Sequence, residues 1–153
     1  MRKILATAAT IGLAGLGALV PAGGAQAATP CDNAWNSAAS GYFYAYASDN
    51  CTGYLGRADG ADSNWGNDQG GFQGSATNNA ESILHKGTSG LAVQVFNGTG
   101  DDWGGGFTCI KKSELYMSSL NGFAFTSGYE VDNAISSHRW VTEASCNGQF
   151  LDS

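Results

Sequence analysis

The sequence is poor in the residues that nucleic acids, anionic membranes and long helices require. It holds only 7 Lys and Arg among 153 residues, against 13 Asp and Glu. A chain this acidic, with no basic stripe, lacks the charge that neutralises phosphate, so nucleic acid and anionic membrane are excluded as partners. Proline occurs twice, and Lys and Glu are scarce beside 23 glycines and 11% aromatic residues. This composition favours short strands and tight turns over long helices.

The only long apolar run lies at the N-terminus. Arg2 and Lys3 precede an Ala-, Gly- and Leu-rich segment over residues 4–20, followed by the small-x-small pattern Ala25-Gln26-Ala27. This order predicts a secretory signal peptide over residues 1–27. The apolar run is short for a membrane span, which needs about 20 apolar residues. Its removal leaves 126 residues with 5 Lys and Arg against 13 Asp and Glu, a net charge of −8. We expect a secreted, extracellular, monomeric single domain with no membrane partner.

All four cysteines lie after the predicted cleavage point. An even count behind a signal peptide indicates two disulfides formed in an oxidising compartment. Three pairings are possible, and no CxxC spacing suggests zinc. We favour the pairing that closes each bridge within one half of the chain, which assumes that the halves fold as separate units. The favoured bridges are Cys31–Cys51 and Cys109–Cys146.

Two similar units follow a small, polar lead-in at residues 28–41. Each runs from an aromatic strand through a turn and a long Gly-rich loop to an Asn-Ala-x-Ser strand entry. The matched pairs are Tyr46 with Phe96, Gly53 with Gly105, and Asn79-Ala80 with Asn133-Ala134. This repeat predicts an all-β sandwich of two Greek keys, at about 42–88 and 91–142, in a domain of residues 42–153 with a disulfide-tied tail. Residues 112–121 fit either a short helix or an irregular crossing.

These features resemble the βγ-crystallin superfamily, which pairs two Greek keys that each carry an (Asn/Asp)-(Asn/Asp)-x-x-(Ser/Thr)-Ser loop. Residues 132–137 (Asp-Asn-Ala-Ile-Ser-Ser) fit this loop fully, and residues 78–83 fit five of its six positions. Tyr46…Cys51-Thr52-Gly53 fits the family's aromatic-x4-aromatic-x-Gly hairpin with Cys as the second aromatic, and Phe96…Trp103-Gly104-Gly105 fits it with two extra residues. The match covers roughly residues 42–141.

Within that superfamily, the whole sequence is similar to small secreted actinobacterial proteins grouped as peptidase inhibitor family I36. The resemblance implies a disulfide-bonded inhibitor of an extracellular metallo- or serine peptidase. Loops 97–106 and 59–74 are the candidate inhibitory segments, with Trp103 or Trp65 as an aromatic anchor. The family has no reactive-site signature that transfers residue by residue, so we assign none.

The resemblance also implies a calcium-binding structural module, our alternative prediction. In the family the two loops face each other and share oxygen ligands, and Ca²⁺ takes about six to eight of these. The implied ligands are Asn78, Asn79, Ser82, Asp132, Asn133 and Ser136. Only Asp132 among them is a carboxylate, so the expected affinity is weak. The competing interpretation is that these side chains cap their own turns.

The sequence offers two further interpretations, glycan binding and catalysis. Exposed aromatic rings at Trp35, Trp65 and Trp103 would suit a glycan- or cell-wall-binding protein, although core packing is the better explanation for most of these rings. Catalysis is not expected, because the sequence has no GxSxG, HExxH, Cys/His or paired-carboxylate signature. The sequence pattern gives neither His85 nor His138 a catalytic partner. Ser137 precedes His138 directly, and neighbouring residues of a strand point to opposite faces.

Overall fold

The computed structural model describes residues 27–100 and 103–152. The predicted signal peptide lies outside the described residues except for Ala27. In the part of the chain that is described, no helix is long and apolar enough to cross a membrane.

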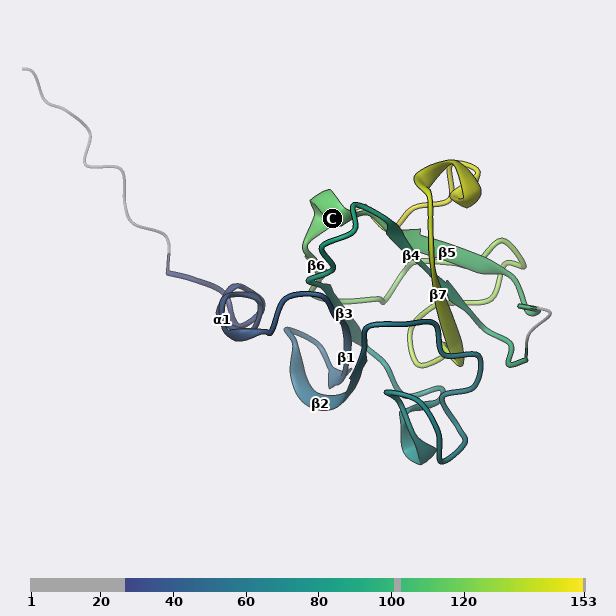
Figure 1. Cartoon of the computed structure of the whole chain (residues 1–153), viewed down its shortest axis with the longest axis horizontal. Coiled ribbons are helices and arrows are strands. Elements are labelled where there is room, and N and C mark those ends of the chain that lie inside the picture. Colours follow the sequence, from purple (N-terminus) through teal and green to yellow (C-terminus); the bar gives the residue numbers. More distant parts are fainter. Residues whose placement is uncertain (1–26, 101–102, 153) are drawn as a thin grey trace, which may run out of the picture.

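Two antiparallel sheets pack face to face (Figure 1). The first has the strand order β2-β1-β3-β6 and the second the order β5-β4-β7. The strands are β1 (Phe43–Ser48), β2 (Thr52–Ala58), β3 (Ser82–His85), β4 (Ala92–Phe96), β5 (Phe107–Ile110), β6 (Tyr116–Met117) and β7 (Ser137–Val141). Because β3 returns beside β1 and β7 beside β4, the predicted all-β sandwich of two Greek keys is confirmed.

The two halves of the chain are connected by backbone pairing. The short strand β6, from the second half, pairs with β3 through Ile83 and Met117. In return, Asp62 of the first half forms an antiparallel bridge to His138 in β7. The assumption that the two halves form separate units is therefore wrong, because the first sheet takes β6 from the second half and Asp62 of the first half bridges to β7 in the second sheet.

The core is one cluster that contains both aromatic and aliphatic side chains. Phe43, Trp65 and Phe72 form its aromatic part. Ile83, Val93, Val95, Ile110, Leu120, Ile135 and Leu151 supply much of the rest. Both predicted disulfides, Cys31–Cys51 and Cys109–Cys146, are confirmed. The pairing is right although the assumption behind it is not, since each bridge anchors a terminal segment to a nearby hairpin or strand.

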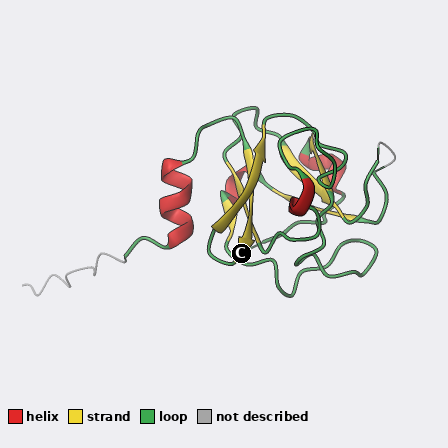
Figure 2. Cartoon of the chain, turned by 90° about the horizontal axis from the view of Figure 1, so that it is seen from below, coloured by secondary structure: helices red, strands yellow, loops and turns green. Residues whose placement is uncertain are grey.

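The lead-in contains a helix that the composition did not predict. Helix α1 (Pro30–Ser37) begins with a capping box, in which Thr29 and Asp32 bond each other's backbone and side chain, and with Pro30 in the first turn. The helix stands beside the strands rather than between the sheets (Figure 2). Cys31 and the Asp32–Tyr116 hydrogen bond of 2.6 Å tie it to the first sheet. Three short 3₁₀ helices, Gly74–Ala76, Lys112–Glu114 and Glu143–Cys146, complete the described elements.

Candidate functional site

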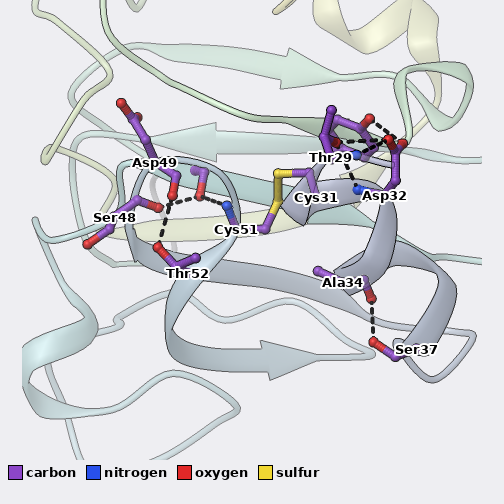
Figure 3. The surroundings of a disulfide bond; sticks show 11 residues. Thr29, Cys31, Asp32, Ala34, Ser37, Ser48, Asp49, Cys51 and Thr52 are labelled. Atoms are coloured by element: carbon purple, nitrogen blue, oxygen red, sulfur yellow. Dashed lines mark hydrogen bonds between the residues drawn. A yellow bond between two sulfur atoms is a disulfide. The ribbon is translucent and has the colours of Figure 1, made fainter. Parts of the chain in front are cut away.

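The β1–β2 hairpin is built on two left-handed residues and one buried serine. Asn50 and Cys51 have φ values of 60° and 57°, the left-handed conformation that tight hairpin turns use. The Ser82 hydroxyl donates to the Ser48 carbonyl (2.7 Å) and accepts from the Cys51 amide (3.0 Å). Figure 3 shows this turn beside the Cys31–Cys51 bridge and the start of α1. The turn is thus held in place by the Ser82 hydrogen bonds and by the Cys31–Cys51 disulfide.

A hydrogen bond from a serine hydroxyl to a turn carbonyl also occurs in the second half of the chain. Ser137 donates to the Gly98 carbonyl at 2.6 Å, as Ser82 does to Ser48. Ser82 therefore corresponds to Ser137 and not to Ser136, so the predicted register of the internal repeat is wrong by one residue at this step. In this register the first loop aligns with the motif as Thr77-Asn78-Asn79-Ala80-Glu81-Ser82, in which Thr77 and Glu81 depart from the family pattern.

The two motif loops face each other across a local two-fold relation. Asn78 and Asn133 are both left-handed, with φ values of 53° and 54°. The Asn78 amide donates to the Ile135 carbonyl, and the Asn133 amide donates to the Ala80 carbonyl, each at 2.9 Å. Asparagine tolerates this conformation better than most residues, which explains its presence at both positions.

Side-chain oxygens lie close together at two places between the facing motif loops. At one end, the Ser136 hydroxyl donates to Asn78 Oδ1 at 2.7 Å. At the other end, Asn133 Nδ2 donates to Glu81 Oε1 (3.3 Å) and to Asp132 Oδ2 (3.1 Å). One amide group thus holds two carboxylates together.

Partial burial raises the pKa of Asp132, and the neighbouring Glu81 charge raises it further. The Asn133 hydrogen bond acts in the opposite direction, while Glu130 and Asp49 add smaller repulsions. Within residues 27–100 and 103–152, the only salt bridge joins Lys111 to Asp152. No basic side chain of the described chain therefore forms an ion pair with these carboxylates, and the ionised cluster is under charge repulsion at neutral pH.

The six predicted ligands do not all belong together. Asn78 and Ser136 form one pair, and Asp132 and Asn133 belong to the carboxylate cluster. Ser82 is buried and bonded to the β1–β2 turn, so the structure separates it from the others. Asn79 is half-buried. Glu81 lies beside the predicted ligands in the sequence, at an x position of the motif, and was not one of the six. The structure places it in the carboxylate cluster, in the Ser/Thr position that results when Ser82 is aligned with Ser137.

The long loop at residues 59–74 is part of the core. Trp65 is 0% exposed and stacks on Phe72 with ring centroids 4.0 Å apart. Buried Asp62 organises the loop by accepting hydrogen bonds from the Asn64 and Phe72 amides. Trp65 cannot anchor a peptidase or stack on a sugar, so both predictions for this residue are wrong. A long Gly-rich loop, typical of functional segments, here serves packing.

The other two candidate tryptophans are half-buried. Lys86 Nζ lies 3.2 Å from the centroid of the Trp35 ring and donates to the Trp35 carbonyl at 2.6 Å. Trp103 lies against the Phe96 ring and the Arg139 guanidinium. Both rings are therefore occupied by neighbours of the same chain.

The two histidines are buried, and each has both ring nitrogens bonded. His138 Nδ1 accepts from the Trp65 indole N–H at 2.9 Å, so its Nε2 carries the proton and donates to the Gly60 carbonyl at 3.0 Å. His85 Nε2 donates to the Leu91 carbonyl and its Nδ1 accepts from the Gly87 amide. Both therefore support the core, and the prediction that the chain is not an enzyme stays a prediction.

Comparison with known proteins adds one structural similarity. No protein-family model matches the sequence, and no curated protein matches it either. A solved structure described as "Evolution of the eye lens beta-gamma-crystallin domain fold" is similar, with a TM-score of 0.49 and 19% sequence identity. The similarity covers 69% of this chain and 89% of that chain. Independently of this similarity, the chain itself is an all-β sandwich of two Greek keys with two disulfides.

Proposed function

We propose that the chain is an extracellular calcium-binding module of βγ-crystallin type. The observation that carries this proposal is the pair of carboxylates, Glu81 and Asp132, held together by Asn133 without a basic partner among the described residues. A divalent cation would relieve their repulsion, and oxygen ligands suit calcium. Asn78 and Ser136 would supply further oxygens at the related end. The two disulfides suit an oxidising, extracellular location.

Calcium is expected to raise the melting temperature of the metal-stripped protein. At a dissociation constant of about 0.1–1 mM, typical of extracellular modules, a few millimolar Ca²⁺ adds roughly 1–2 kcal/mol, or roughly 3–8 °C. Asp132→Asn should remove this gain. Without calcium the same variant should melt at an equal or higher temperature, because a carboxyl whose pKa is raised by its surroundings destabilises the fold when ionised.

The matched control is Asp68→Asn, which removes the same charge from an exposed position outside the cluster. This variant should keep the full calcium-dependent gain. The proposal would be refuted if calcium left the melting temperature of the native protein unchanged. It would also be refuted if calcium raised the melting temperature of Asp132→Asn as much as that of the native protein.

The second candidate function is inhibition of an extracellular peptidase, as the resemblance to peptidase inhibitor family I36 predicts. One observation favours it. Strand β2 is an edge strand, its N-terminal half is exposed, and the turn before it is tied by Cys31–Cys51. Tyr54 on this strand is 60% exposed. A rigid, exposed edge with an aromatic side chain suits docking as an added strand in an enzyme cleft.

Titration of the disulfide-bonded protein into a thermolysin-like metallopeptidase and a subtilisin-like serine peptidase tests this function. The expected result is stoichiometric loss of one activity without cleavage of the added protein. Tyr54→Ala should weaken inhibition by about 30-fold, as loss of a central aromatic anchor does. Tyr129→Ala is the control, because Tyr129 is 66% exposed but lies outside β2. Full activity of both peptidases would exclude inhibition of these classes.

A further inference from the structure

A hollow of about 280 Å³ lies at the end of the sandwich where the two halves of the chain are joined. Its lining comes from four separate segments. Asp59 follows β2, residues Thr88, Ser89 and Leu91 connect β3 to β4, and Trp140 belongs to β7. Two glycines complete the wall. This hollow is separate from the carboxylate cluster, and the sequence analysis did not single out Trp140 as a binding residue.

The Trp140 ring is held rigidly in the wall. Its indole N–H donates to the Gly60 carbonyl at 3.1 Å, and the His85 ring packs edge-on against it at 5.2 Å. Gly87 lies so close that a Cβ atom there would be 2.4 Å from the indole ring. His85 is itself fixed by bonds to Leu91 and Gly87. The aromatic wall is therefore preorganised, which lowers the entropy cost of binding.

The polar groups of the hollow are largely unused. Asp59 is exposed, and its carboxylate has no hydrogen-bond or salt-bridge partner in the described chain. The Thr88 hydroxyl likewise has no partner among those residues. Ser89 Oγ accepts a long bond of 3.4 Å from the Leu91 amide, which leaves its own proton free to donate. The site thus offers a charged acceptor and two hydroxyls beside one aromatic ring.

This combination selects among ligand classes. The carboxylate and the absence of Lys, Arg and His from the described lining disfavour anions. Ammonium recognition typically uses a cage of several aromatic rings, whereas only one ring lines this hollow. A pyranose has an apolar C–H face that packs on an indole ring, and hydroxyls that donate to a carboxylate. The volume is just below the roughly 300–1,000 Å³ of ordinary ligand sites, so one ring fits.

We propose that this hollow binds a single pyranose unit of a neutral glycan, packed on Trp140 with its hydroxyls bonded to Asp59. The affinity expected for one sugar ring is weak, in the millimolar range, and rises only if neighbouring units also touch the surface. The proposal does not depend on calcium binding at Glu81 and Asp132.

The test is NMR titration of the native, disulfide-bonded protein with the methyl glycosides of glucose, galactose, mannose and N-acetylglucosamine. At least one glycoside should shift the Trp140 indole N–H signal in a saturable manner. Asp59→Ala should weaken that binding at least about tenfold, because it removes hydrogen bonds to a charged acceptor. Asp59 is exposed and unpaired, so this variant should fold normally, and Asp68→Asn controls for the loss of one charge.

Three outcomes would overturn the proposal. One is the absence of a saturable shift with every glycoside. Another is equal binding by Asp59→Ala and the native protein. The third is a response of the Trp140 signal to choline chloride alone, which would assign the hollow to an ammonium ligand instead. A melting curve of each variant would separate loss of the site from loss of the fold.

Discussion

Replacing Trp65 by alanine should lower the free energy of unfolding by about 3–5 kcal/mol, as loss of a large buried aromatic side chain does. Trp65 is fully buried, stacks on Phe72 and lies 6.2 Å from the Phe43 ring. Its indole N–H also satisfies His138 Nδ1, so the variant leaves a buried acceptor without a donor. Urea denaturation of the native and variant proteins at neutral pH measures the difference.

Trp103→Ala is the matched control for this prediction. Trp103 is half-buried and its ring lies against Phe96 and Arg139. The cost expected there is about 1 kcal/mol, because less apolar area leaves water on folding. An equal loss of stability in the two variants would contradict the assignment of loop 59–74 to the core.

Acidification from pH 7 to pH 4 should lower the free energy of unfolding by about 3 kcal/mol through His138 alone. Complete burial lowers the pKa of His138 to about 3, and its bond to Gly60 opposes this only in part. The unfolded chain takes up the proton near pH 6.5, whereas the folded chain does not until about pH 3. The unfolded state therefore binds more protons in this window, and stability falls as the pH falls.

His138→Gln isolates this contribution. The Gln amide can both donate and accept but does not titrate, so the slope of stability against pH between 6.5 and 4 should flatten. His85→Gln provides the comparison, since burial also lowers the pKa of His85. Asp32 loses its own stabilisation only at more acidic pH, because its hydrogen bonds to Tyr116 and Thr29 lower its pKa. Identical slopes for native protein and His138→Gln would refute the prediction.

Local patterns in the sequence were sufficient for the strands and the bridges. The aromatic strands that open the two repeat units, at Tyr46 and Phe96, predicted β1 and β4. The lead-in helix carried a readable signal as well. Thr29-Pro30-Cys31-Asp32 contains both halves of a capping box with Pro at the first turn, but overall composition argued against helices.

The burial of Trp65 and the register of the repeat could not be predicted from the sequence, because contacts between distant residues determine them. The burial of Trp65 depends on His138, 73 positions away, which no local period encodes. The register of the repeat was set by Ser82 and Ser137, whose bonds to Ser48 and Gly98 are visible only after folding. The contact of Glu81 with Asn133 spans 52 positions, so the place of Glu81 in the candidate site followed only once the repeat was correctly aligned.

The connection between β3 and β4 divides the chain into two parts that pair with each other. Cleavage at the exposed Thr88–Gly90 stretch would release two fragments, of which the first loses the edge strand β6 from its sheet and the second loses the bridge from Asp62 to His138. The fragments are therefore expected to be more stable together than apart. Two intact copies can satisfy the same pairings by trading halves, which gives this fold a ready route to a domain-swapped dimer.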